Sequence, residues 1–347
     1  MTGADPDATN LTRDGMNILV TGASGMLGRA VAEALIARSA KLGRRDRVYT
    51  FQRGASSIEG AQDRRGSLGD PGAVERAVDG IDAVIHLAAK VSFAGEAEEF
   101  DDVNIEGTRR LLTAARQAGV SDVVFVSSPS VAHHGWSIVG DGAGPASPEH
   151  ARGNYARTKA AAELLALGMD SPGFRVAAVR PHIVWGPGDT QLVERVVARA
   201  KSGRLPLLDS GAALIDTTYV DNAASAITAA LNRMDHAHGR ALVVTNGEPR
   251  PVGELIAGIC AAGGAPTPTR HIPGWLARAA GSVIERVWTV APGEDEPPMT
   301  RFLAEQLSTA HWFDQRQTRQ VLDWTPEVSI DEGLSRLAAH YGGRASG

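Results

Sequence analysis

The chain has 347 residues, of which 43% are apolar and 22% are charged. This composition excludes wholesale disorder, a collagen and a coiled-coil rod, and the net charge of −5 gives no general electrostatic reason to bind nucleic acid. No stretch approaches the ~18–20 uncharged apolar residues of a transmembrane span. The single cysteine, Cys260, and the polar residues 1–15, which we expect to form a flexible tail rather than a signal peptide, favour the cytoplasm.

The first half of the chain alternates short apolar runs with segments of helical periodicity. The runs predict strands at 17–21, 47–51, 83–87, 122–126 and 175–180. The segments between them predict helices that include 25–38, 71–79, 101–118 and 155–168. Continuous apolar strands separated by helices are typical of a parallel sheet covered on both faces. The sequence therefore predicts an α/β fold with a doubly wound parallel sheet of the Rossmann type.

The alternation fades beyond residue 186 and returns briefly, with a helical pattern at 217–231 and a strand pattern at 241–244. We therefore predict a discontinuous boundary. Residues 16–185 and about 216–246 would form a dinucleotide-binding domain, and residues 186–215 and 247–347 a smaller, mixed substrate-binding lobe.

A glycine-rich segment follows the first predicted strand directly. It reads Gly22-Ala23-Ser24-Gly25-Met26-Leu27-Gly28 and leads into a helix. Glycines there permit a tight turn and close packing of helix on strand, and the helix N-terminus offers N–H donors to a phosphate. A plain strand–helix turn is the alternative. The strand–turn–helix context favours a dinucleotide site that includes Gly22, Ser24, Gly25, Met26 and Leu27.

The end of the second predicted strand bears on the choice of cofactor. NAD sites usually carry an acidic residue there, which binds the ribose 2′-hydroxyl. This chain has Gln52 and Arg53 instead. An arginine pairs well with a 2′-phosphate, so we predict NADP(H), with a solvated loop residue as the alternative role for Arg53.

The sequence Tyr155-Ala156-Arg157-Thr158-Lys159 places a tyrosine and a lysine four residues apart, on one face of a predicted helix. A nearby ammonium favours the phenolate and is expected to lower the tyrosine pKa by ~1–3 units, which suits proton transfer. The predicted strand 122–126 ends just before Ser127 and Ser128. Because ligands bind at the carboxyl ends of parallel strands, a serine there is positioned to polarise a substrate carbonyl.

Four motifs, TGASGMLG, SSPSV, YARTK and VRPHIVWGPGD, occur in this order. Together they closely resemble the extended short-chain dehydrogenase/reductase superfamily over nearly the whole chain. DTTYVDNAA, NGEPRP and PPMTRFLAEQLSTAHWF resemble its 3β-hydroxysteroid dehydrogenase-like branch. Within that branch the chain is most similar to the 2-alkyl-3-oxoalkanoate reductases of bacterial long-chain olefin biosynthesis.

The resemblance implies roles for individual residues. Tyr155 would be the acid/base, Lys159 its electrostatic partner, and Ser128 the catalytic serine, with the role of Ser127 open. Asn104 would support the fourth strand and the active-site helix. The cofactor-binding residues implied in addition to the glycine loop and Arg53 are Ser67, Leu68, Ala88, Ala89, Lys90, Tyr155, Lys159, Pro181 and Ile183. Ser67 departs from the aspartate that family members often carry to hold the adenine amine, and Asp70 is not in the matching position.

Three features remain open at the level of sequence. His182, which follows Pro181, either faces the substrate or packs in the core. The segment 272–290 has apolar residues at helical spacing, among them Trp275, Leu276, Val283 and Val287. It would be a lid over an acyl chain, an interfacial membrane helix, a partner surface or plain core. The histidines at 133, 134, 236 and 238 lack the spacing of metal ligands, so we predict no metal site.

The motifs therefore predict an NADP(H)-dependent reductase or dehydrogenase. The resemblance implies that it uses NADPH to reduce a long-chain, lipid-like 2-alkyl-3-oxoalkanoic acid to the 3-hydroxy acid. The alternatives are a 3β-hydroxysteroid or sterol-carboxylate dehydrogenase, a nucleotide-sugar epimerase or dehydratase, and a non-catalytic dinucleotide sensor. A sensor would be expected to lose part of the Ser/Tyr/Lys set, which this chain retains. A homodimer and association with other enzymes of olefin biosynthesis are further expectations.

Overall fold

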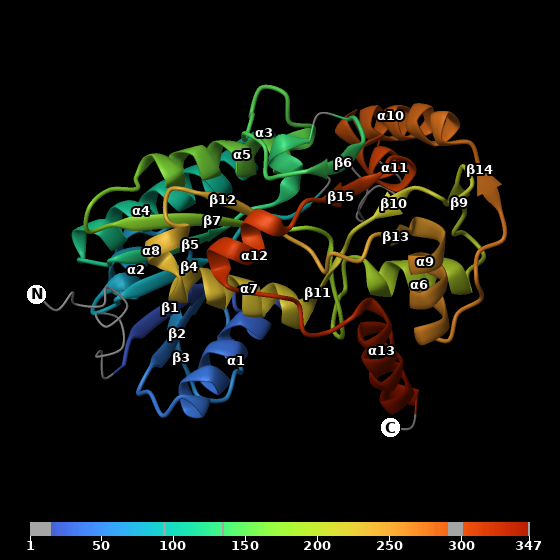
Figure 1. Ribbon diagram of the computed structural model, residues 1–347. Coiled ribbons are helices and arrows are strands. Elements are labelled where there is room, and N and C mark those ends of the chain that lie inside the picture. The colour runs from blue at the N-terminus through green and yellow to red at the C-terminus, as the bar shows by residue number, and fades with distance from the viewer. Residues whose placement is uncertain (1–14, 93–94, 134, 291–300, 346–347) are drawn as a thin grey trace, which may run out of the picture.

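The computed structural model describes residues 15–92, 95–133, 135–290 and 301–345. Its central feature is a seven-stranded parallel sheet within these ranges (Figure 1). In spatial order the strands are β12 (Ala241–Val244), β7 (Arg175–Pro181), β5 (Asp122–Val126), β4 (Ala83–His86), β1 (Asn17–Thr21), β2 (Arg47–Gln52) and β3 (Ala61–Arg65). The predicted doubly wound fold is confirmed. The strand order reverses between β1 and β4, where open α/β sheets bind their ligands.

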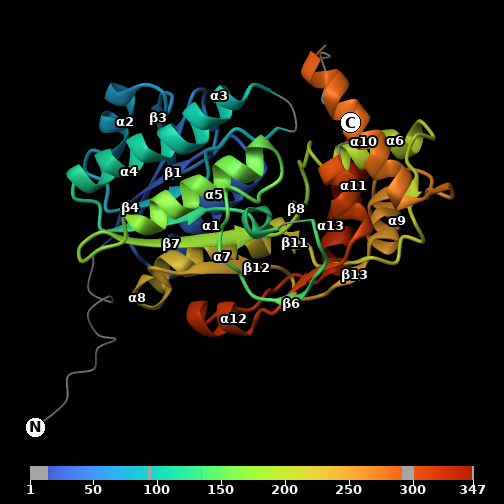
Figure 2. The same ribbon diagram turned by 90° about the horizontal axis from the view of Figure 1, so that it is seen from above.

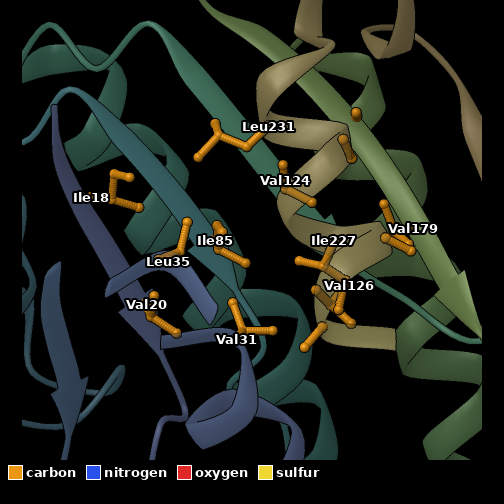
Figure 3. Packing of buried hydrophobic residues seen from close by; sticks show 14 of the residues in the cluster. Ile18, Val20, Val31, Leu35, Ile85, Val124, Val126, Val179, Ile227 and Leu231 are labelled. Carbon is orange, nitrogen blue, oxygen red and sulfur yellow. The ribbon is translucent and has the colours of Figure 1, made fainter. Parts of the chain in front are cut away.

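Helices cover both faces of this sheet (Figure 2). On one face α1 (Met26–Lys41) and α7 (Val220–Asn232) pack against β1, β4, β5 and β7 in the apolar cluster of Figure 3, which includes Val20, Val124 and Ile227. On the other face α2 (Pro71–Val78), α4 (Gly107–Gln117) and α5 (Gly153–Gly168) bury a second cluster around Leu19, Phe125 and Leu112. Apolar side chains alternate between the two clusters along β1, so the strand is buried on both sides.

The strand β3 was not predicted from the sequence. It reads AQDRR, has no buried residue and pairs only with β2, at the edge of the sheet. A polar edge strand carries no apolar run, so only its pairing with β2 defines it. The predicted helix 101–118 is also more complex than expected. It contains a π-helical turn (Asp101–Glu106) and α4, and the short helix α3 (Ala97–Phe100) precedes it directly.

A second, smaller lobe has its own sheet and core. Its four strands are, in order, β13 (Arg250–Pro251), β10 (Leu214–Ile215), β15 (His311–Phe313) and β6 (Ile138–Asp141). The helices α6 (Val193–Lys201), α9 (Val252–Ala262) and α13 (Ile330–Ala345) bury Trp185, Ile215 and Ile259. Two short pairs complete the sheet structure: β8 (Val184–Trp185) with β11 (Thr218–Tyr219), and β9 (Leu207–Leu208) with β14 (His271–Ile272).

Helices α10 (Gly274–Val290) and α11 (Arg301–Ser308) pack against each other at one end of this lobe, close to β6 and β15 in Figure 1. Among the side chains that the structure describes here, Leu208, Ala277 and Ala304 form a buried apolar cluster, with Ile272 and Leu307 packed against it. None of the described helices is both long and apolar enough to span a bilayer.

Two short segments contact elements on the other side of the predicted domain boundaries. Strand β6 lies within residues 16–185 but pairs with β15 in the second sheet, so the chain enters the lobe once before residue 186. Helix α12 (Arg316–Leu322) lies within residues 247–347 but packs on the central sheet, where Leu322 joins the first cluster together with α8 (Met234–Ala237). Both segments are short, and their sequences do not reveal which core they join.

Candidate active site

The glycine loop between β1 and α1 brings three chain segments into close contact. Gly22 has φ +75°, and a Cβ atom there would lie 2.9 Å from the backbone nitrogen of Ala88. A Cβ atom on Gly28 would lie 2.3 Å from the carbonyl oxygen of Gly22. Gly25 is the N-cap of α1 and has no side chain that could cap the helix. The N–H groups in the first turn of α1 therefore face the loop at Ser24 and Gly25, which is exposed. This backbone fits a pyrophosphate at a helix N-terminus. Met26 and Leu27 turn inward and are half-buried.

A carboxylate that the sequence analysis did not single out lies beside the end of β2. Asp63, on the edge strand β3, accepts hydrogen bonds from Thr50 Oγ1 at 2.7 Å, Gln52 Nε2 at 3.1 Å and Ser56 N at 3.2 Å. These bonds lower the pKa of Asp63 to about 2, so it stays ionised. Arg53 is exposed next to Gln52, and Arg29 reaches from α1 to donate to the carbonyl of Ser56. The ribose end of the site therefore has both signs of charge.

A buried hydrogen-bond chain connects the glycine loop to the catalytic helix. Thr21 Oγ1 accepts from the backbone N–H groups of Leu87 and Ala88, so its own proton points to His86 Nδ1 at 2.7 Å. The other ring nitrogen of His86, Nε2, then donates to Thr108 Oγ1 at 3.0 Å, and Thr108 donates to the carbonyl of Asn104. Burial, reinforced by the charge of Lys159, lowers the pKa of His86 to about 3, which keeps the imidazole neutral.

Asn104 continues this chain with its side chain. Its Oδ1 accepts from Lys90 N at 2.7 Å, and its Nδ2 donates to Thr158 Oγ1 at 3.0 Å and to the carbonyl of Lys90. Asn104 thus joins the segment after β4, which contains Ala88, Ala89 and Lys90, to α5. The ammonium of Lys90 pairs with Glu99. The sequence offers no periodic signal for His86, which lies in an apolar run.

Ser128 and Tyr155 meet at the carboxyl end of β5. Ser128 begins the 3₁₀ turn Pro129–Ala132, and its Oγ accepts from Ser130 Oγ at 2.9 Å and Ser130 N at 3.3 Å. With both of these acting as donors, the proton of Ser128 is directed away from the turn. The side chain of Ser128 lies close enough to that of Tyr155 to lower the pKa of the phenol. A carbonyl oxygen placed at this pair would face two hydroxyl groups.

Lys159 lies one turn beyond Tyr155 on α5 and is buried. Its Nζ donates to the carbonyl of Val126 at 2.7 Å and lies 4.2 Å from the ring centre of Phe125. Burial lowers the pKa of Lys159 to about 7, against the opposing charge of Glu163. Burial raises the pKa of Tyr155 to about 12, against the bond to Ser128. The expected lowering of the tyrosine pKa is therefore wrong for this arrangement, because desolvation of the phenolate dominates.

The segment after β7 divides into two environments. Pro181 is buried at the end of the strand, and Ile183 is half-buried with φ +42°. The ring of His182 is buried, with Nδ1 2.6 Å from the carbonyl oxygen of Asp216 and its centre 5.0 Å from that of Phe313. These contacts correspond to the packing alternative for His182, at the junction of the two lobes.

Trp275 and Leu276 lie in the first turn of α10, and 66% and 45% of their surfaces are exposed. Plain core packing therefore does not describe them, whereas Ala277 beside them is buried. The side chains of Val283 and Val287 lie outside the described part of the chain.

The segment between β3 and α2 contains two of the predicted cofactor-binding residues. Ser67 is exposed, and its Oγ accepts a hydrogen bond from Gly69 N, whereas Leu68 is buried. Asp70 caps α2 by accepting a hydrogen bond from Ala73 N.

No group of three or more His, Cys, Asp or Glu side chains is arranged to hold a metal ion in the ranges that the structure describes, which omit His134.

Comparison with known proteins identifies the family. The model of the NAD dependent epimerase/dehydratase family matches residues 18–245. The chain belongs to this family. Its members in the comparisons include a 2-alkyl-3-oxoalkanoate reductase of Stenotrophomonas maltophilia (strain K279a), 39% identical over 93% of this chain and 99% of that protein. A sterol-4-alpha-carboxylate 3-dehydrogenase of Mus musculus is 27% identical over 96% of this chain and 94% of that protein.

Solved structures agree on the fold of this epimerase/dehydratase family member. The crystal structure of gox2253 has a TM-score of 0.74 at 23% identity and covers 95% of this chain and 98% of that one. MoeE5 in complex with UDP-glucose and NAD has a TM-score of 0.70 at 23% identity, over 95% of this chain and all of that one. The protein is thus an NAD(P)-dependent oxidoreductase of the short-chain dehydrogenase/reductase type.

Proposed function

We propose that this protein uses NADPH to reduce a 2-alkyl-3-oxoalkanoic acid to the 2-alkyl-3-hydroxyalkanoic acid. The observation that carries the proposal is that Ser128, which directly follows β5 at the carboxyl edge of the sheet, and Tyr155, in the first turn of α5, interact through their side chains. Two hydroxyl donors at one point suit a ketone oxygen. A relative with this named activity aligns over nearly the whole chain.

The residues have distinct roles in this proposal. When bound, the nicotinamide supplies the hydride that forms the new C–H bond at the ketone carbon. Ser128 donates a hydrogen bond to the ketone oxygen, with its lone pairs engaged by Ser130. Tyr155 gives its proton to the same oxygen, completing the alcohol. Its raised pKa keeps it protonated at neutral pH, which suits the direction of reduction.

The choice of NADPH rests on the basic side chains at the end of β2. Arg53 is exposed, and Arg29 lies against the neighbouring Ser56–Ser57 turn, so each can approach a 2′-phosphate. The carboxylate of Asp63 accepts hydrogen bonds from Thr50, Gln52 and Ser56, so its oxygens are already engaged by the protein and are less available to the ribose 2′-hydroxyl of NADH. NADPH is therefore the better match, with Arg53 as its principal contact.

A second candidate is a sterol-carboxylate dehydrogenase, favoured by the sterol-4-alpha-carboxylate relatives. Both candidate substrates have a carboxylate and an oxygen function at the β-carbon, so the site chemistry fits both. The lower identity of the sterol relatives, 27% against 39%, places this candidate second.

One assay separates the candidates. NADPH and NADH oxidation is measured with freshly prepared 2-alkyl-3-oxo acids, beside NADP⁺ and NAD⁺ reduction with a 3β-hydroxysteroid and its 4-carboxylate. We expect turnover of the oxo acid with preference for NADPH. Efficient steroid oxidation without oxo-acid reduction would favour the second candidate, and a preference for NADH would overturn the role of Arg53. The homodimer, the pathway association and the division into domains remain predictions.

A further inference from the structure

An ion pair joins the start of the catalytic helix to the α10–α11 pair. Arg152 directly precedes α5 and lies three residues before Tyr155. Its Nη1 donates to Oε1 of Glu305, on α11, at 2.8 Å. The two residues lie 153 positions apart in the sequence, so this contact is created by the tertiary fold. It places a cation where the catalytic half of the site meets the lobe.

The two partners differ in exposure. The side chain of Glu305 is only 5% exposed, whereas that of Arg152 is 34% exposed. A buried carboxylate thus contacts one edge of the guanidinium, and the 34% exposure of the side chain means that a ligand can approach it from solvent. An arginine in this position is preorganised, because its planar fork is oriented before any anion arrives.

Gly135 brings the same guanidinium close to the loop that follows Ser128. A Cβ atom on Gly135 would lie 2.6 Å from Nη2 and 2.8 Å from Cζ of Arg152. Gly135 also has φ +88°, which favours glycine independently. Arg152 therefore lies between the loop of the catalytic serine, the helix of the catalytic tyrosine and α11.

We propose that Arg152 binds the carboxylate of the substrate and that Glu305 holds Arg152 in place while moderating its charge. The inference rests on the proposed function, which supplies a carboxylate two bonds from the ketone carbon. A group that binds this carboxylate must lie near the Ser128–Tyr155 pair. Two observations support this for Arg152: it lies three residues before Tyr155 in the sequence, and its guanidinium packs against Gly135 in the loop that follows Ser128. Charge-assisted bonds from a guanidinium to a carboxylate are strong and directional.

The test compares an acid with its neutral ester. Oxidation of a 2-alkyl-3-hydroxy acid and of its methyl ester is measured with NADP⁺, because hydroxy acids do not decarboxylate as 3-oxo acids do. The readout is the ratio of kcat/KM for acid to that for ester. Arg152→Gln should lower this ratio about 10- to 100-fold, the range of hydrogen bonds to charged groups. Glu305→Gln keeps an oxygen that accepts from Nη1 but removes the negative charge, so it should raise the ratio about two- to fivefold.

A matched control lies on the same helix. Arg157 is 35% exposed and pairs with Asp101 at 2.7 Å, but it points about 200° around the helix axis from Tyr155. Arg157→Gln should leave the acid-to-ester ratio unchanged. A purely structural ion pair predicts the opposite pattern, in which Arg152→Gln and Glu305→Gln lower the melting temperature and affect both substrates equally.

Each outcome decides the inference separately from the proposed function. If the wild-type enzyme oxidises neither acid nor ester, the proposed function fails. If it oxidises both and Arg152→Gln leaves the ratio unchanged, only the role of Arg152 fails. If Arg152→Gln does not fold, Arg152→Lys and Glu305→Gln test the role of Arg152. Arg152→Lys should keep part of the preference for the acid over the ester. An acid-to-ester ratio for Glu305→Gln at or below the wild-type value would overturn the proposal.

Discussion

The two halves of the site rest on cores of very different size. The proposed catalytic residues lie on α5 and just after β5, beside a sheet that is buried between two large apolar clusters. In the described part of the α10–α11 pair, Ala277 and Ala304 are buried with Leu208, while Trp275 and Leu276 are exposed. A large, close-packed core holds side chains in one geometry, and a small one permits local movement. This contrast suggests that the sheet edge performs the same chemistry on every substrate and that α10–α11 adapts to its size.

Polar contacts reinforce the rigid half. His86, Asn104 and Thr158 are buried members of one hydrogen-bond chain that runs from β1 to α5. A fully satisfied buried network strongly favours one arrangement, since each broken bond leaves a buried polar group unpaired. Burial, reinforced by the charge of Lys159, keeps His86 neutral, so it introduces no second charge beside Lys159.

The largest expected effect comes from removing the proton donor. Tyr155→Phe keeps the ring but lacks the hydroxyl, so kcat should fall about 10²–10⁴-fold for substrates of every length. Cofactor affinity, measured by fluorescence titration, should change little. The control is Tyr49→Phe, on β2. A Tyr155→Phe enzyme within a few-fold of wild type would remove Tyr155 from the catalytic half.

The cofactor end gives the next largest effect. Arg53→Ala should raise the KM for NADPH about 10- to 100-fold, the loss of one charge-assisted contact, and leave the KM for NADH nearly unchanged. Gln52→Asp should shift the preference further toward NADH by repelling the 2′-phosphate. Arg47→Ala, at the opposite end of β2, is the control. Equal losses for both cofactors would show that Arg53 does not contact the phosphate.

Lys159 provides a test by pH. Its pKa is about 7 in the folded protein and ~10.4 in an unfolded chain, so the unfolded chain binds this proton more tightly. The free energy of unfolding of the cofactor-free protein should therefore rise as pH increases from 7 to 9, by at most about 1.4 kcal/mol per pH unit. Urea denaturation measures this slope.

Two variants test whether Lys159 causes the dependence of the unfolding free energy on pH. Lys159→Met should abolish the contribution, whereas Lys41→Met, an exposed lysine, should preserve it. A slope that is the same in wild type and Lys159→Met would contradict the lowered pKa. The comparison should be made below pH 10, where Tyr155 begins to contribute with the opposite sign.

The smallest effect should come from α10. If Leu276 covers the alkyl chain of the substrate, kcat/KM should rise with chain length by at most about fourfold per methylene, from ~0.8 kcal/mol of burial. In Leu276→Ala that rise should flatten while short substrates react as before. Leu42→Ala, an exposed leucine at the end of α1, is the control. An unchanged length profile would mean that α10 does not adapt to substrate size.

The local sequence determined the elements that have their own pattern. The buried strands β1, β4, β5 and β7 are largely continuous apolar runs. At Gly22 and Gly28 a side chain would collide with nearby backbone atoms, so only glycine fits. Tyr155 and Lys159 share a helix face because they are four residues apart. Each of these features follows from a local sequence pattern, so it can be predicted from the sequence alone.

Tertiary structure decided what depends on distant partners. The polar strand β3 exists through its pairing with β2, Asp63 reaches the end of β2 through that pairing, and Arg152 meets Glu305 across 153 residues. The pKa of Tyr155 likewise follows from burial between elements, which outweighs the effect expected from its neighbour Lys159. Desolvation and long-range pairing depend on which segments fold against each other, and spacing along the chain does not encode that information.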